Sequence, residues 1–73
     1  MAIKLTEQQI AKLRMRDDIR VWRPMYSRNV HIRALNERWL TYCGQVRPSE
    51  VGRQFEWIDD FCEACLIGCG GGE

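Results

Sequence analysis

The most restrictive feature of this sequence is a change of hydrophobic period along the chain. Between residues 19 and 35 apolar positions recur every second residue, which is the period of a β-strand. The segments 6–16 and 49–66 have apolar spacings of three and four residues, which is the period of a helix. In a chain of 73 residues both element types must share one small core. We therefore predict an α+β domain, with two helices packed on a small antiparallel sheet of two or three short strands.

The first helix has a clear start signal. Thr6 and Gln9 form a Thr-x-x-Gln capping box, in which each side chain accepts a hydrogen bond from the other residue's backbone N–H. The acidic pair at positions 17 and 18 would oppose the helix dipole if it lay in the last turn. We therefore expect this helix to end between Met15 and Asp17.

The segment 19–43 fits two structures. Residues 19–22 and 30–35 alternate in hydrophobicity, which predicts two short strands, the first ended by Pro24. A turn at Asn36-Glu37 would lead into a third strand over residues 39–43. Helical spacing is also present, at Ile32, Leu35, Trp39 and Cys43, with Gly44 as a C-terminal cap. An all-α three-helix domain is therefore the alternative.

The most regular helical pattern lies in the last third of the chain. Its apolar positions are Val51, Phe55, Ile58, Cys62 and Cys65, and Pro48 with Ser49 precedes them as a helix start. We predict a helix over residues 49–66, a single domain over 1–67 and a flexible glycine-rich tail over 68–73. The predicted core contains Ile10, Leu13, Val21, Ile32, Trp39, Phe55, Ile58 and Phe61.

The cysteines raise the question of a metal site, because Cys-x-x-Cys, here Cys62 and Cys65, is a common half of a zinc site. If one helix ran through Cys69, the two ends of the Cys62–Cys69 segment would lie about 10 Å apart along its axis, too far for one zinc. A site would require the helix to end near Cys65 and Cys43 or His31 to approach. A second Cys-x-x-Cys is missing. We therefore predict no metal ligand and no cofactor.

Catalytic chemistry is not indicated either. His31 is the only histidine, and on a strand it would point with Arg33 to the polar face. A redox Cys-x-x-Cys needs a helix N-terminus to lower the thiol pKa, whereas the predicted helix places the motif late. The sequence has neither a Gly-x-Ser-x-Gly elbow nor a phosphate-binding loop. We predict that the chain is not an enzyme and binds no small-molecule substrate.

Charge is distributed unevenly along the chain. Residues 1–53 carry a net charge of +6 and residues 54–73 carry −5, although the whole chain has only +1. Arginine and aromatic side chains are typical of protein-binding hot spots, and they also bind nucleic acid. We predict that the partner-binding residues are Arg14, Arg16, Arg20, Trp22, Arg23, Tyr26, Arg28, Arg33 and Arg38. A net charge near neutrality makes direct nucleic-acid contact secondary.

The amino terminus MAIKLTEQQ has polar residues where a signal peptide would be apolar, and no stretch approaches the roughly 20 apolar residues of a membrane span. We therefore expect a cytoplasmic protein without membrane partners. In that reducing compartment the cysteines are expected as thiols or metal ligands and not as a disulfide framework.

In length, in its arginine-rich composition and in its opening MAIKLTEQQIAKLRMRDD, the chain resembles the small RNA polymerase-binding transcription inhibitors of lytic Xanthomonas phages. The resemblance covers the full chain and rests on overall similarity, not on a signature motif. It implies a bacteriophage host-takeover protein that binds the large subunits of the bacterial RNA polymerase core. It further implies inhibition of initiation by sigma factor displacement, together with transcription antitermination.

We thus expect a monomeric, non-enzymatic transcription regulator that acts by protein–protein interaction in the bacterial host cytoplasm. Two alternatives remain. One is a small nucleic-acid-binding regulator, and the other is a zinc-dependent protein interaction module.

Overall fold

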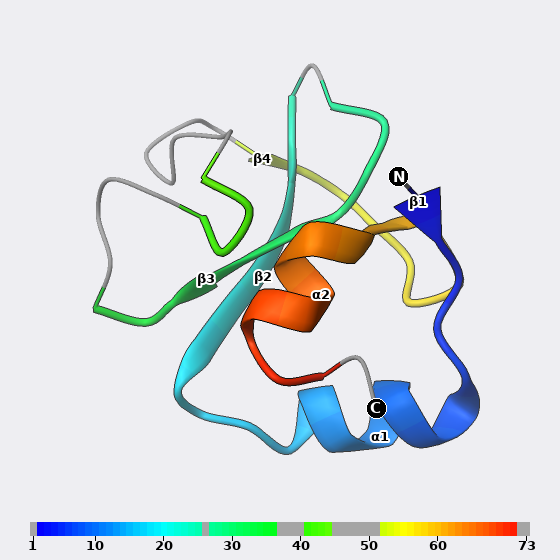
Figure 1. Cartoon of the computed structure of the whole chain (residues 1–73). Helices are drawn as coiled ribbons and strands as arrows, with labels where there is room; N and C mark the ends of the chain where they lie inside the picture. The colour runs from blue at the N-terminus through cyan, green and yellow to red at the C-terminus, as the bar shows by residue number, and fades with distance from the viewer. Residues whose placement is uncertain (1, 26, 37–40, 45–51, 72–73) are drawn as a thin grey trace.

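The computed structural model describes residues 2–25, 27–36, 41–44 and 52–71. Within these ranges the chain forms two helices and two small antiparallel sheets, which confirms the predicted α+β class and not the all-helical alternative (Figure 1). The elements are β1 (Ala2–Ile3), α1 (Glu7–Arg14), β2 (Ile19–Pro24), β3 (His31–Ala34), β4 (Gly52–Arg53), β5 (Phe61–Cys62) and α2 (Glu63–Gly68). One sheet has the strand order β3-β2-β4, and β1 pairs with β5 in the other. Neither of these helices has the length and apolar character that crossing a membrane requires.

Helix α1 starts and ends where the sequence predicts. The Gln9 backbone N–H donates to Thr6 Oγ1 at 3.1 Å, and the Thr6 N–H donates to Gln9 Oε1 at 2.9 Å, so both halves of the capping box are formed. The helix ends at the C-cap residue Met15. Leu13 is its one buried side chain, so this single residue anchors α1 to the core.

The two strands predicted from alternation are confirmed. β2 and β3 pair antiparallel, with Val21 opposite Ile32 and Trp22 opposite His31. Pro24 is the last residue of β2, because a proline has no backbone N–H to continue a ladder. Within β2, residues 19–22 pair with β3, and residues 23–24 pair with β4.

The predicted third strand over residues 39–43 is wrong where the structure describes it. Residues 41–44 form a turn, closed by the Gly44 N–H, which donates to the Thr41 carbonyl oxygen at 2.9 Å. The Tyr42 N–H donates to the Ile32 carbonyl oxygen at 3.0 Å, so the turn lies against β3. Trp39, a predicted core residue, lies outside the described residues.

The helix predicted over residues 49–66 is also wrong. Residues 49–51 lie outside the described part, and the following segment contains β4, a turn at residues 57–59 and β5 before α2 begins at Glu63. Asp59 fixes that turn, because its carboxylate accepts from the Glu56 N–H at 2.8 Å while its own N–H donates to the Glu56 carbonyl oxygen at 2.9 Å.

The apolar spacing that suggested a helix reflects an aromatic cluster instead. Phe55 and Trp57 meet edge to face with ring centroids 5.5 Å apart, and Trp57 stacks on Phe61 at 5.7 Å. Phe61 also pairs with β1 at Ile3 and forms a parallel bridge to Val30. The aromatic contacts join near neighbours in sequence, whereas the contacts of Phe61 with Ile3 and Val30 join segments far apart in sequence.

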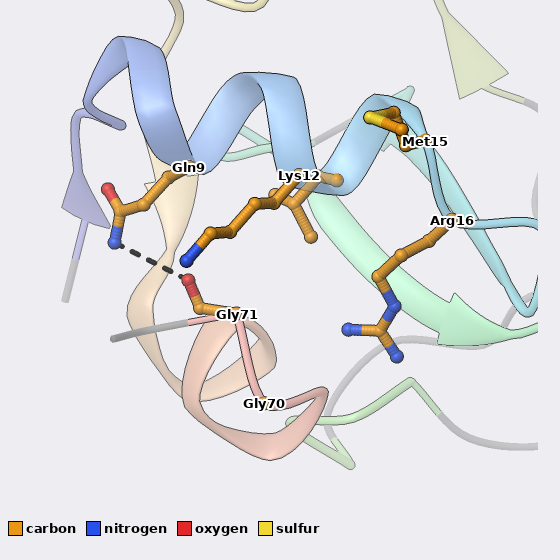
Figure 2. A pocket seen from close by; sticks show the side chains of 7 residues that line it. Gln9, Lys12, Met15, Arg16, Gly70 and Gly71 are labelled. Atoms are coloured by element: carbon orange, nitrogen blue, oxygen red, sulfur yellow. Dashed lines mark hydrogen bonds between the residues drawn. The ribbon is translucent and has the colours of Figure 1, made fainter.

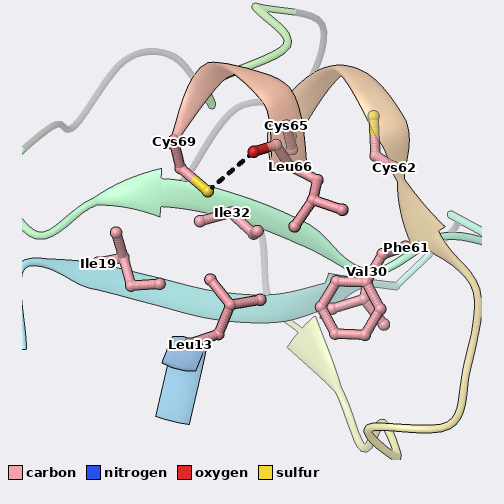
Figure 3. Close-up of a cluster of buried hydrophobic side chains, with 9 residues drawn as sticks. All are labelled: Leu13, Ile19, Val30, Ile32, Phe61, Cys62, Cys65, Leu66 and Cys69. Carbon is pink, nitrogen blue, oxygen red and sulfur yellow. Dashed lines mark hydrogen bonds between the residues drawn. The ribbon is translucent and has the colours of Figure 1, made fainter. Parts of the chain in front are cut away.

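The core lies between the sheet, α1 and α2 (Figure 3). We call its fully aliphatic and aromatic members the apolar cluster, which comprises Leu13, Ile19, Val30, Ile32, Phe61 and Leu66. Of the predicted core residues, Leu13, Ile32 and Phe61 are buried. Ile10, Val21 and Phe55 are only half-buried, and Ile58 is wrong as a core residue, because its place in the turn leaves it 74% exposed.

Candidate metal centre

Four metal-binding side chains converge beside β3. The ligand atoms of His31, Cys43, Cys62 and Cys65 all lie within 4.8 Å of one another, and we call this group the His/Cys cluster. His31 comes from the start of β3, Cys43 from the turn at 41–44, Cys62 from β5 and Cys65 from the first turn of α2. Three separate segments of the chain are therefore needed to assemble it.

His31 is the centre of the cluster. Its Nδ1 atom lies 3.5 Å from the Cys43 Sγ and 3.5 Å from the Cys65 Sγ. The prediction that His31 points to a polar surface is wrong, since it is only 5% exposed. Cys43 and Cys65 are 12 and 34 residues away along the chain, so the strand pattern around His31 gave no sign of them.

The position of the Cys-x-x-Cys element also differs from the prediction. Cys62 is the N-cap residue of α2 and Cys65 lies in its first turn, whereas the sequence pattern placed both late in a longer helix. As a consequence the two thiols lie on the short connection from β5 into α2. Cys43 and His31 approach that connection, as the sequence analysis required for zinc, although the helix begins near Cys65 and does not end there.

The cluster is held by hydrogen bonds outside it. Ser27 Oγ lies 3.1 Å from His31 Nε2, and the Ser27 hydroxyl also donates to the Asn29 carbonyl oxygen at 3.1 Å. Thr41, which is buried, places its Oγ1 3.0 Å from the Cys43 Sγ. The backbone N–H of Cys62 donates to the Val30 carbonyl oxygen at 2.9 Å, which ties the start of α2 to β3.

Burial shapes the protonation of the cluster in the absence of metal. Burial raises the pKa of the Cys65 thiol to about 12, against opposing hydrogen bonds from the backbone N–H groups of Ile32 and Cys43. Burial likewise lowers the pKa of His31 and favours its neutral form. A thiol with a raised pKa is a poor nucleophile, which applies to Cys65.

Cys69 stays apart from the cluster. Its Sγ donates to the Leu66 carbonyl oxygen at 3.3 Å, and it lies at the opposite end of α2 from Cys62 (Figure 3). All four cysteines lie in the described part of the chain, and none of them forms a disulfide.

The predicted partner-binding residues that the structure describes lie on α1, on β2, on β3 and in the segments that follow α1 and β2. Arg14, Arg20 and Arg28 are exposed, on α1, on β2 and after β2. Arg20 and Arg33 lie directly opposite each other on β2 and β3. Tyr26 and Arg38 lie outside the described residues.

The other arginines are engaged within the molecule. Arg16 forms a two-pronged ion pair with Asp18, at 2.9 and 2.8 Å, and also donates to the Cys69 carbonyl oxygen. The Asp18 carboxylate and the Arg16 guanidinium shift each other's pKa, lowering that of Asp18 and raising that of Arg16. These contacts bind the end of α1 to the end of α2.

Three further members of the predicted set are half-buried. Arg23 lies 3.5 Å from the Asp59 carboxylate, and Arg33 donates to the carbonyl oxygens of Ala34 and Leu35. Trp22 is the third, and its buried indole N–H has no hydrogen-bond partner in the part of the chain that the structure describes. These three side chains thus contribute to the fold as well as to the surface.

A groove of about 300 Å³ lies between α1 and residues 70–71 (Figure 2). The Gln9 side-chain amide donates across it to the Gly71 carbonyl oxygen at 3.4 Å, and Lys12 and Arg16 contribute positive charge. Its walls contain no pair of acid and base residues or nucleophile among the described residues that line it. The groove therefore gives no sign of a catalytic site.

Comparison with protein-family models, curated proteins and solved structures finds no match to this chain.

Proposed function

We propose that this protein is a non-enzymatic bacteriophage transcription regulator that binds the large subunits of the host RNA polymerase core in the bacterial cytoplasm. It inhibits initiation by displacing sigma factor, and it promotes antitermination on the elongating enzyme. The proposal rests on the resemblance of the chain to small polymerase-binding phage inhibitors.

The observation that carries the proposal is the form of the opening segment, which is one part of the overall similarity. This segment folds as a capped helix with one buried side chain, Leu13, and an otherwise largely exposed surface that includes Lys12 and Arg14. Arg20 and Arg28 add exposed guanidinium groups on and after β2. Arginines of this kind bind acidic protein surfaces through paired hydrogen bonds.

The mechanism follows from the size of the chain. A domain of 73 residues has little chain from which to build an enclosed active site, so it acts through its surface. By occupying a polymerase surface that sigma factor also needs, a stoichiometric inhibitor shifts the enzyme toward the sigma-free state.

The direct test is a binding assay between the purified full chain and purified polymerase core, followed by competition with sigma factor. We expect a stoichiometric complex and release of sigma. The variant R14Q/R20Q/R28Q should bind at least tenfold more weakly, because hot-spot arginines each contribute more than about 1.4 kcal/mol. Failure of the parent protein to bind core enzyme would refute the proposal.

A charge-matched control separates specific contacts from overall charge. The variant Q8E/Q54E/I58E changes three exposed positions and lowers the net charge by the same amount as the arginine variant. It should retain polymerase binding. Affinity for nucleic acid alone that falls steeply with salt would instead favour the nucleic-acid-binding alternative.

A further inference from the structure

We propose that the His/Cys cluster is a structural zinc site, in which His31 Nδ1 and the sulfurs of Cys43, Cys62 and Cys65 bind one Zn²⁺ tetrahedrally. This inference is independent of the polymerase proposal, because it concerns how the chain holds its fold. It departs from the sequence-based expectation that the chain has no metal ligand.

The donor set fits zinc. Three cysteines and one histidine form one of the common ligand sets of structural zinc sites, whereas Mg²⁺ and Ca²⁺ require oxygen ligands. With Zn–S about 2.3 Å and Zn–N about 2.0 Å, neighbouring ligand atoms of a tetrahedron lie about 3.5–3.8 Å apart. The two distances from His31 Nδ1 to the sulfurs of Cys43 and Cys65 are both 3.5 Å. All four ligand atoms lie within 4.8 Å of one another, so a small contraction completes the tetrahedron.

The hydrogen bonds of Ser27 select the protonation state that a metal ligand needs. The hydroxyl has one proton, and it donates this proton to the Asn29 carbonyl oxygen. Toward His31 Nε2 the hydroxyl oxygen can therefore only accept, so Nε2 carries the ring proton. Nδ1 is then left with its lone pair directed at the thiol sulfurs, as zinc ligation requires.

His31 Nδ1 faces two sulfurs at once. Nδ1 has a single lone pair, yet two sulfurs lie at hydrogen-bond distance from it. At most one thiol can donate to it. A divalent cation placed between the four ligand atoms would contact all of them at once. Binding of such a cation would explain why the three segments converge.

The site has a structural role and not a catalytic one. Four protein ligands complete the coordination of zinc and leave no position for water or substrate. Through its ligands the ion would join β3, the turn at 41–44 and the start of α2. The turn is otherwise held to β3 by the Tyr42 N–H bond to Ile32. Zinc would thus compensate for the small core of the domain.

The test uses the full chain purified without added chelator, with its zinc content measured by elemental analysis. We expect one zinc per chain. Replacement by Co²⁺ should give the intense visible bands of a tetrahedral ion and thiolate-to-cobalt charge transfer in the near ultraviolet. Protein that is folded, lacks metal and gives no such bands when Co²⁺ is added would overturn the proposal.

Single substitutions identify the ligands. Cys43→Ser, Cys62→Ser, Cys65→Ser and His31→Asn should each weaken zinc binding by roughly a hundredfold or more, beyond the effect of an outer residue. Cys69→Ser is the matched control, because Cys69 lies outside the cluster and is 7% exposed, close to the 6% of Cys62, and it should retain one zinc. Equal loss of zinc in Cys69→Ser and Cys62→Ser would contradict the assignment.

Ser27 contacts the ligand His31 without being a ligand itself, so a Ser27 variant tests the site even where a ligand variant does not fold. Ser27→Ala leaves all four ligands in place and removes the hydroxyl that orients His31. We expect zinc affinity to fall by roughly 10-fold to 100-fold, with the cobalt bands still present. An unchanged affinity would contradict ligation through Nδ1.

Discussion

The apolar cluster and the His/Cys cluster lie on the same small scaffold, but they are held together in different ways. The apolar cluster is close-packed, with Val30, Ile32, Phe61 and Leu66 completely buried, and burial alone accounts for its cohesion. The His/Cys cluster brings together three thiols and an imidazole, and two of the sulfurs lie 3.5 Å from the same imidazole nitrogen. The hydrophobic pattern of the sequence therefore specifies the apolar cluster. The proposed zinc ion specifies the His/Cys cluster, and the hydrophobic pattern does not reveal it.

Of the changes predicted here, removal of zinc should have the largest effect on the stability of the protein. A strong chelator should destabilise the protein by at least several kcal/mol, since structural zinc contributes roughly 10–16 kcal/mol to the folding of zinc-finger peptides. The loss would appear in circular dichroism and thermal unfolding. Addition of Zn²⁺ should restore the fold, while Mg²⁺ should not, because it prefers oxygen ligands. A melting temperature unaffected by chelation would contradict the account.

Leu66→Ala tests the apolar side. Leu66 is fully buried in α2, directly after the ligand Cys65. Truncation of such a side chain costs about 2–5 kcal/mol in the free energy of unfolding, through lost burial and the cavity left behind. Chemical denaturation of the zinc-loaded protein would measure it. The exposed neighbour Ile67, replaced by alanine, serves as control and should change stability little.

Thr6→Ala should have a smaller effect, confined to α1. The substitution removes the hydroxyl that caps the helix, at a cost of about 1 kcal/mol. Because α1 contributes no ligand to the His/Cys cluster, zinc stoichiometry should stay at one per chain. If Thr6→Ser failed to preserve the stability of the parent, the loss would not be due to capping.

The smallest expected effect is the pH dependence of the Arg16–Asp18 pair. Its hydrogen bonds lower the pKa of Asp18 below the ordinary 3.8, so the folded state binds this proton less readily than the unfolded state. The stabilisation is therefore present above that ordinary value and is lost as the pH falls through the folded pKa. The difference in stability between the parent and Asp18→Asn should shrink on acidification. A difference that grew as the pH fell would reverse the assigned sign.

The parts of the fold that the sequence predicts are those set by near neighbours. The capping box of Thr6 and Gln9 spans three residues, and the strand alternation around Val21 and Ile32 is equally local. The second helix was misjudged because Phe61 pairs with Ile3 and forms a bridge to Val30, both distant in sequence, and the apolar spacing matched a helical period by coincidence.

The sequence analysis kept a zinc site only as an alternative, for the same physical reason. Its four ligands come from segments as far apart as 34 residues, and the bridging distances depend on how α2 packs on β3. The sequence signal that could have found it was present: one histidine and a third cysteine outside the Cys-x-x-Cys element. In the structure α2 begins at Glu63, and the predicted helix over residues 49–66 does not form. Cys62 and Cys65 therefore lie at the start of α2, within reach of His31.

The most direct test of the zinc site is a comparison of the mass of the purified chain under native and denaturing conditions. The account predicts a native mass that exceeds the denatured mass by one zinc ion less the protons that it displaces, with the excess kept in Cys69→Ser. A compact native chain with the same mass under both conditions would contradict it.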